Sequence, residues 1–170
     1  MENPEDILFD DTWSLWYHKK VDIWKIHGYE NIYQIKNLKD YWLFFNNIDK
    51  LGGITASHYF LMRNTIQPIY EDASNARGHA WTLLVSRNEN GRDNCEEIAK
   101  KCWEEITLKA LGETLLKDSK KINGITINVK DEGIIIQIWT SIKTSISIDM
   151  LPNSIRTMSK TIRSKVLKDK

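Results

Sequence analysis

Two aromatic side chains and a carboxylate fall in segments dominated by turn-forming residues. Trp24 lies in the segment 19–28, and Tyr70 and Glu71 lie in the long segment 64–79. Core burial is less automatic for an aromatic residue in such a segment. Two rings from different loops can clamp a planar ligand between them. If the ligand is cationic, cation–π attraction strengthens the stack.

Glu71 directly follows Tyr70, which would place a carboxylate at the edge of this aromatic clamp. A carboxylate accepts two parallel N–H donors, and guanine presents such a pair from N1 and N2. The alternative interpretation is that Tyr70 covers the core and Glu71 is solvated. Spacing alone favours this alternative.

Other chemistry has little support in the sequence. No glycine-rich phosphate loop, nucleophile elbow or His-Glu-x-x-His helix occurs. Cys95 and Cys102 lie seven residues apart on an expected helix, which is typical of packing residues. The histidines are scattered without metal-ligand spacing: His18, His27, His58 and His79. We therefore expect a binding protein without a metal or cofactor, and not an enzyme.

The composition limits the class of protein. The 170 residues carry a formal net charge of +1, so any nucleic-acid contact must be local and not a matter of bulk charge. Hydrophobic residues make up 41% of the chain and charged residues 28%, which is typical of a globular domain. Neither a signal peptide nor an apolar run of about 20 residues is present. We expect a cytoplasmic protein that does not enter membranes.

Hydrophobic periodicity predicts strands that alternate with helices. After a flexible arm over residues 1–12, a single domain is expected over residues 13–170. Strands are expected at 13–18, 32–35, 57–62 and 81–85. Helices are expected at 38–51, with Asn37 as the N-cap, at 93–116 and, with a basic surface, at 152–168.

A hairpin over residues 125–139 separates two kinds of side chain. A turn at Glu132 and Gly133 would pair Asn128 with Gln137 and gather the aliphatic residues on one face. The other face then carries a set too polar for a core and too aromatic for plain solvent: Thr126, Asn128, Lys130, Gln137 and Trp139. The pattern predicts an α+β fold with an antiparallel sheet covered on one side.

Several spaced motifs, spread over residues 13–139, carry a family resemblance. They are Trp13-Ser14-Leu15-Trp16 with Trp24; Asp40-Tyr41-Trp42; Ile66-Gln67-Pro68-Ile69-Tyr70-Glu71-Asp72 with Asn75, Arg77-Gly78 and Trp81; Trp103 with Leu108 and Gly112-Glu113; and Asn128-Val129-Lys130 before Ile138-Trp139-Thr140. Together they resemble translation initiation factor 4E, the messenger-RNA cap-binding family. The resemblance implies a curved, cupped-hand sheet with helices on its convex face and 7-methylguanosine on its concave face.

The resemblance also implies roles for individual residues. Trp24 and Tyr70 would be the stacking rings, with Tyr where the family usually has Trp. Glu71 would read the guanine edge, and Trp139 would touch the N7 methyl group. The phosphate path would be lined by two further residues, Asn128 and Lys130.

The chain departs from the family where basic residues usually hold the triphosphate. Ala80, Glu132 and Ile135 stand at three such positions. Most of the usual clamp is therefore missing, unless Arg77 or His79 replaces it. The predicted basic helix over residues 152–168 also leaves little room for the last strand that family members carry.

A second surface is implied on the helical side. Leu38 and Trp42 share a helix face away from Tyr41 and Phe45. In the family, this face receives an amphipathic helix from the scaffold factor 4G or from a repressor. Glu104 departs from the pattern, since an apolar residue is usual there. The matching residues are Leu38, Trp42, Glu105, Leu108 and Gly112.

These features predict a monomeric, non-enzymatic module that binds capped messenger RNA and recruits a scaffold factor for translation initiation. Two alternatives stay open. The protein could be a homologue that represses translation by occupying caps, or a protein-interaction module whose cap slot has decayed.

Overall fold

The computed structural model describes residues 3, 7–18, 22–87, 92–141, 149, 151, 153–158 and 162–166. Seven strands form one antiparallel sheet in the order β2-β1-β3-β5-β6-β4-β7. They are β1 (Leu8–His18), β2 (Glu30–Asn37), β3 (His58–Arg63), β4 (His79–Ser86), β5 (Ile122–Lys130), β6 (Gly133–Thr140) and β7 (Ile162–Val166). The predicted antiparallel α+β fold is confirmed.

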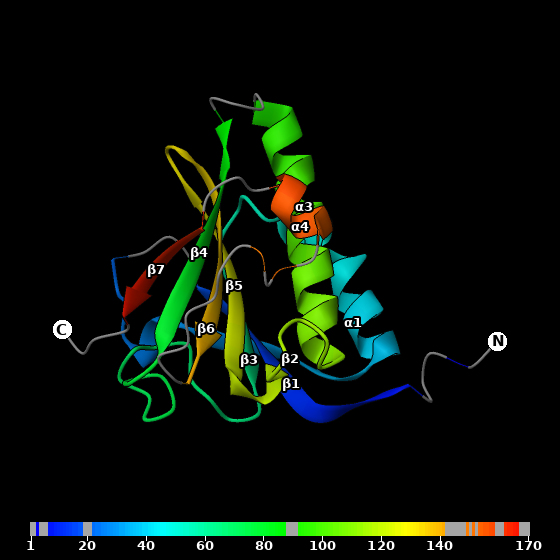
Figure 1. Ribbon diagram of the computed structural model, residues 1–170, viewed down its shortest axis with the longest axis vertical. Helices are drawn as coiled ribbons and strands as arrows, with labels where there is room; N and C mark the ends of the chain where they lie inside the picture. Colours follow the sequence, from blue (N-terminus) through cyan, green and yellow to red (C-terminus); the bar gives the residue numbers. More distant parts are fainter. Residues whose placement is uncertain are drawn as a thin grey trace.

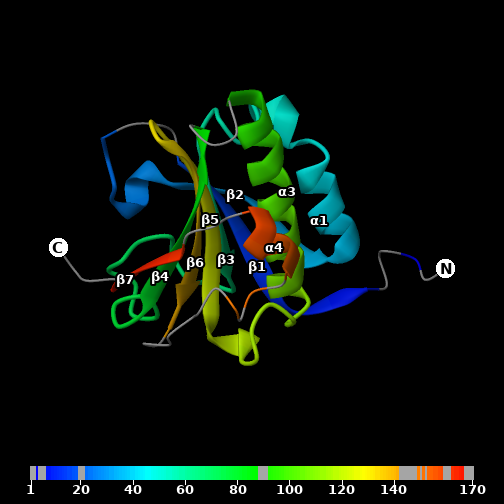
Figure 2. The same ribbon diagram turned by 45° about the horizontal axis from the view of Figure 1, so that its top comes forward.

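The helices α1 (Leu38–Phe45), α3 (Arg92–Leu111) and α4 (Asn153–Met158) cover one face of the twisted, curved sheet, as Figures 1 and 2 show from two directions. Short 3-10 turns complete the described elements: η1 (Ile26–Gly28), η2 (Ile48–Leu51) and η3 (Ser119–Lys121). Within the described residues, no helix is both long and apolar enough to span a membrane.

The sheet separates two hydrophobic clusters. The larger one lies between sheet and helices and includes the aliphatic residues of the hairpin, among them Ile125, Ile127 and Ile136. The smaller one lies on the opposite face and is built around Phe60, Met62, Ala80 and Trp139. Because successive side chains of a strand point to opposite faces, Trp139 and Ile138 enter different clusters. The predicted division of the hairpin faces is confirmed.

The hairpin register differs from the prediction by two residues. Asn128 pairs with Ile135 and Lys130 pairs with Gly133, so the turn consists of Asp131 and Glu132. Gly133 belongs to β6 because it lies against β4, where a Cβ atom would collide with the carbonyl oxygen of Val85. A shift of two residues keeps every side chain on its face, which explains why the predicted faces survive the wrong register.

Both long helices end earlier than predicted. The helix expected to reach residue 51 stops at Phe45, and Asn47 donates its side-chain N–H to the carbonyl of Leu43, in competition with the helix backbone. Its predicted cap is confirmed, since the Asn37 side chain accepts from the N–H of Asp40 at 2.8 Å. The α3 helix stops at Leu111 and not at 116, followed by Gly112.

Both ends of the chain also differ from the prediction. The strand β1 begins at Leu8, so residues 8–12 are sheet and not part of a flexible arm. The segment predicted as one basic helix contains a six-residue helix, α4, and the strand β7. β7 pairs with β4 from Leu83↔Ile162 to His79↔Val166, so pairing with an open sheet edge outweighs the helical pattern. The last strand that seemed absent is therefore present.

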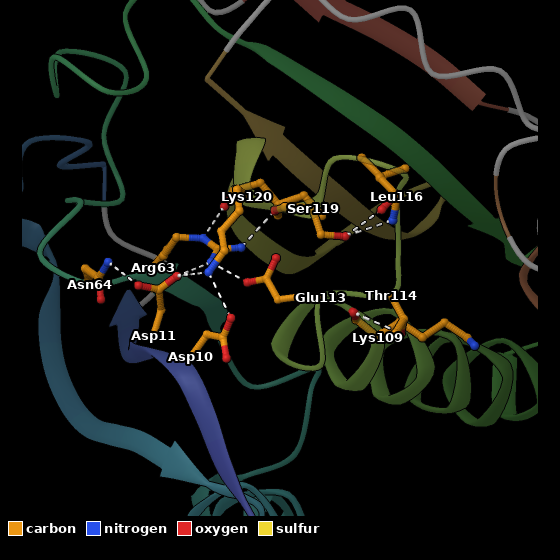
Figure 3. A network of polar contacts seen from close by, with 11 residues as sticks. Asp10, Asp11, Arg63, Asn64, Lys109, Glu113, Thr114, Leu116, Ser119 and Lys120 are labelled. Carbon is orange, nitrogen blue, oxygen red and sulfur yellow. Dashed lines mark hydrogen bonds and ion pairs between the residues drawn. The ribbon is translucent and has the colours of Figure 1, made fainter.

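A buried arginine ties four elements together at one end of the sheet (Figure 3). Arg63, at the end of β3, is 5% exposed and forms ion pairs with Asp11 of β1 and with Glu113 after α3. Its Nε donates to the carbonyl of Ile122 at 2.7 Å, and Nη2 donates to that of Ser119 at 2.8 Å.

The carboxylate of Asp11 is held in its charged form. A hydrogen bond from Asn64, followed by the bond and charge of Arg63, lowers the pKa of Asp11. The guanidinium also lies 4.6 Å from the centre of the buried Trp13 ring. Every charged group of this cluster therefore has a partner of opposite sign.

Replacing Arg63 should show how much this cluster contributes to the stability of the fold. We expect Arg63→Met to lower the free energy of unfolding by about 3–5 kcal/mol, because two carboxylates and two carbonyls lose their common partner. Lys120→Met is the matched control: Lys120 pairs with Asp10 at 3.0 Å and lies 3.8 Å from Asp11, but it is exposed, so its replacement should lower the free energy of unfolding far less. Urea unfolding of both variants measures the difference, and equal losses would contradict the assigned role.

Candidate functional site

A pocket of about 470 Å³ opens beside the smaller cluster, on the sheet face opposite the helices. Its lining combines five aromatic rings with amides, one carboxylate and one cation: Trp24, Tyr29, Phe60, Pro68, Ile69, Tyr70, Glu71, Asn128, Lys130, Ile135, Gln137 and Trp139. The structure thus brings together all six residues that were predicted to contact a base and its phosphates. We call this space the aromatic pocket.

Trp24 forms one wall of the aromatic pocket. It lies just before η1, and 49% of its surface is exposed. Its ring stacks on His18, with ring centres 4.4 Å apart and planes 22° apart. One part of the indole is therefore supported by the protein, while much of the ring stays open to a ligand.

Tyr70 lies on another wall, against the floor formed by Trp139. The two ring centres are 5.1 Å apart and the planes differ by 32°. Trp139 itself is 2% exposed and meets Phe60 edge-on at 6.2 Å. Burial raises the pKa of the Tyr70 hydroxyl, so the ring is a neutral phenol. No ring contact among the described residues joins Trp24 to Tyr70.

The segment that carries Tyr70 is held by buried side-chain hydrogen bonds. Asn75 is fully buried and donates to the carbonyls of Gln67 at 2.9 Å and Ile69 at 2.8 Å. Asp72 accepts from the N–H of Gln67 at 2.9 Å. Asn123 of β5 donates to the side-chain oxygen of Asn75 at 2.9 Å. These bonds order the backbone that places Tyr70 and its neighbour before any ligand binds.

The polar part of the pocket carries little charge. Glu71 and Lys130 are both exposed, and they are its acidic and basic lining residues. Asn128 is 8% exposed, and Gln137 donates to the hydroxyl of Thr82 at 3.1 Å. Among the described residues, the formal charges of the lining therefore sum to zero.

The two residues considered as replacement cations lie outside the lining. His79 stacks on Trp81 at 6.2 Å, and Trp81 belongs to the large cluster on the helical side. Arg77 is exposed and does not line the pocket. At two of the departures from the family pattern the structure places apolar groups, since Ala80 is fully buried beside Trp139 and Ile135 lines the pocket.

Sequence reasoning missed two rings of the pocket. Tyr29 follows η1, in the same turn-rich region as Trp24, so the criterion that selected Trp24 would have found it. Burial, followed by the charges of Tyr70 and Glu71, raises the pKa of Tyr29 above its ordinary value. Phe60 gave no such signal, because β3 is buried on both faces and shows no alternation.

The residues of the predicted partner surface lie on α1 and α3, except Gly112, which directly follows α3. The hydroxyl of Tyr41 on α1 contacts that of Thr107 on α3 at 2.9 Å. Trp42 is half-buried, with its ring edge-on to Tyr41 at 5.2 Å. The other predicted residues of this surface are partly or fully exposed: Leu38, Glu105, Leu108 and Gly112. Trp42 and Leu108 both pack on the large cluster, so part of each side chain contributes to the core.

Relatives of known type share this sequence and fold. The chain is 27% identical over 146 residues to eukaryotic translation initiation factor 4E-3 of Caenorhabditis elegans, covering 81% of this chain and 56% of that protein. It is 27% identical over 145 residues to eukaryotic translation initiation factor 4E of Homo sapiens, covering 82% and 64%. The chain therefore spans somewhat over half the length of these relatives.

Solved structures of similar fold include eIF4E-3 of Ascaris suum with m7G cap, at a TM-score of 0.73 and 23% identity, covering 94% of this chain and 91% of that one. Another is C. elegans eIF4E-3 with the 4E-binding protein Mextli and cap analog, at a TM-score of 0.77 and 22% identity, covering 94% and 92%. The model of the family described as eukaryotic initiation factor 4E matches residues 8–168. Because this match spans nearly the whole chain, the protein belongs to the eukaryotic initiation factor 4E family.

Proposed function

We propose that this protein binds the 7-methylguanosine cap of messenger RNA in the aromatic pocket. The observation that carries the proposal is the meeting of six residues, predicted separately from distant motifs, in one pocket lining. The related Ascaris suum protein of the same fold was solved with m7G cap.

The proposed base contacts follow from the chemistry of the lining. Trp24 and Tyr70 stack on the two faces of the base, and methylation at N7 makes that base cationic, which favours the electron-rich faces of neutral rings. Glu71 accepts the N–H groups of the guanine edge. Trp139 contacts the methyl group, while Asn128 and Lys130 lie along the phosphates.

We further propose that the helical side recruits a scaffold protein, which would make the chain a translation initiation factor with no catalytic step. The related C. elegans protein was solved with the 4E-binding protein Mextli. Translation of messenger RNA takes place in the cytoplasm, so this role would place the protein there. A repressor would bind caps but not the scaffold, and a module with a decayed slot would bind only the partner.

Each wall of the pocket should contribute to cap affinity. We expect Trp24→Ala and Tyr70→Ala to weaken binding of 7-methyl-GTP by about 1–3 kcal/mol each, because each removes one stacking face. Glu71→Gln should also weaken it, because the guanine N–H groups lose a charged acceptor. Glu30→Gln, at an exposed position on β2, is the matched control. Titration with 7-methyl-GTP, followed by tryptophan fluorescence, measures the affinity of each variant. Parental affinity in Trp24→Ala, Tyr70→Ala and Glu71→Gln would contradict the proposed site.

The phosphates should add little to affinity. Of the described residues that line the aromatic pocket, Lys130 is the basic one, and Ile135 stands where a further basic side chain is usual in the family. A missing charge-assisted hydrogen bond typically forfeits about 1.5–3 kcal/mol. We therefore expect a small gain from 7-methyl-GMP to 7-methyl-GTP and a shallow salt dependence. Calorimetry with mono-, di- and triphosphate cap analogues at two salt concentrations measures both effects. A steep rise in affinity with each added phosphate would contradict the prediction.

The helical surface should act independently of the pocket. We expect Trp42→Ala to abolish binding of an amphipathic scaffold peptide, one with the Tyr-x-x-x-x-Leu-hydrophobic motif that the family resemblance implies, because an interface tryptophan is often a hot spot. Cap affinity should stay unchanged. Leu43→Ala is the control, since Leu43 is 49% exposed on the same helix. A pull-down and a cap titration on each variant are the measurements. Joint loss of cap binding and thermal stability would instead mark Trp42 as a core residue.

A further inference from the structure

We propose that His18 is a positioning residue for Trp24, an inference that rests on the proposed cap-binding function. His18 ends β1 and is fully buried. Its imidazole lies against the indole of Trp24, with ring centres 4.4 Å apart and planes only 22° apart. A flat buried ring under an exposed one is a platform that fixes the plane in which Trp24 meets a ligand.

A hydrogen bond from the same side chain fixes the backbone of Trp24. The Nε2 atom of His18 lies 2.8 Å from the carbonyl oxygen of Ile23, the residue directly before Trp24. A carbonyl only accepts, so Nε2 carries the proton. The backbone of His18 is itself held, because its carbonyl accepts from the hydroxyl of Ser57. The side chain of His18 therefore has two functions: it supports the ring of Trp24 by stacking, and it tethers the backbone beside Trp24 by a hydrogen bond.

The segment around Trp24 is packed closely against this histidine. Tyr29 lies on His18 at 4.4 Å between ring centres, with its plane tilted by 43°. A Cβ atom at Gly28 would collide with the carbonyl of Ile23, the group that His18 binds. His18 thus contacts both aromatic residues that this segment contributes to the aromatic pocket.

The arrangement has a consequence for affinity. A loop side chain that is free before binding must lose conformational entropy when it stacks on a ligand. Because Trp24 is already supported on one side and tethered at its base, this loss has largely occurred before the cap arrives. Removing His18 should therefore weaken cap binding although His18 does not line the pocket.

Three substitutions separate the two functions. His18→Ala removes both, His18→Phe keeps a flat ring without a donor, and His18→Gln keeps a donor without a ring. We expect His18→Ala to weaken 7-methyl-GTP binding roughly three- to ten-fold, and each of the others to recover part of the loss. His27→Ala is the matched control, because His27 is exposed in the same segment. Thermal unfolding of each variant identifies those that fold.

A readout without ligand tests the position of Trp24 itself. In protein labelled with 5-fluorotryptophan, Trp24→Phe identifies the fluorine resonance of Trp24 among those of the seven tryptophans. We expect His18→Ala and His18→Gln to move this resonance toward that of the free amino acid, because the stacked ring is gone. His18→Phe and His27→Ala should leave it near its parental position.

The two readouts separate this inference from the function on which it rests. If the parent protein does not bind 7-methyl-GTP, the proposed function fails, but the fluorine resonance still decides the role of His18. An unmoved Trp24 resonance in folded His18→Ala or His18→Gln overturns the inference. Parental cap affinity in His18→Ala also overturns it. So does a result in which neither His18→Phe nor His18→Gln binds 7-methyl-GTP more tightly than His18→Ala.

Discussion

The buried guanidinium of Arg63 fixes the start of β5, and one wall of the aromatic pocket is connected to that point. Its Nε holds the carbonyl of Ile122, where the pairing of β5 with β6 shifts by one residue between Ile122 and Gly124. The residue inside this irregularity, Asn123, donates to Asn75 in the segment that carries Tyr70. A charge buried at one end of the sheet is thus connected, through a backbone irregularity, to a wall of the aromatic pocket.

The opposite wall is held by a different device. Trp24 depends on the stack and the hydrogen bond of His18, while Tyr70 depends on buried amides and on contact with Trp139. Neither wall is part of the sheet, but each is anchored to residues that are. Segments of irregular structure can therefore present a preorganised pair of rings, because contacts with the sheet hold each of them.

The success of the sequence analysis followed the strength of each local pattern. Alternation in the hairpin predicted its two faces, because the side-chain period of two is strict, and placed Asn128, Lys130 and Trp139 on the polar one. The loop positions of Trp24 and Tyr70, with Glu71 beside Tyr70, suggested ligand contacts, and the family resemblance joined the two sets in one site. The wrong assignments arose where a long-range contact decides. The place of Gly133 depends on crowding by Val85, and β7 forms because an edge of β4 is available. Neither neighbour is visible in a local window of sequence.

The electrostatics of the pocket indicate how a cationic base would be recognised. In the part of the chain that the structure describes, the lining has one carboxylate and one cation, both exposed, so formal charge offers little net attraction. Burial raises the pKa of both Tyr29 and Tyr70, which keeps their rings as neutral phenols. Apart from the hydrogen bonds of the Glu71 carboxylate, attraction for a methylated base would then come from the quadrupoles of aromatic faces, which act at short range. Selectivity of this kind depends on the orientation of the rings, and that orientation is what the buried contacts behind them determine.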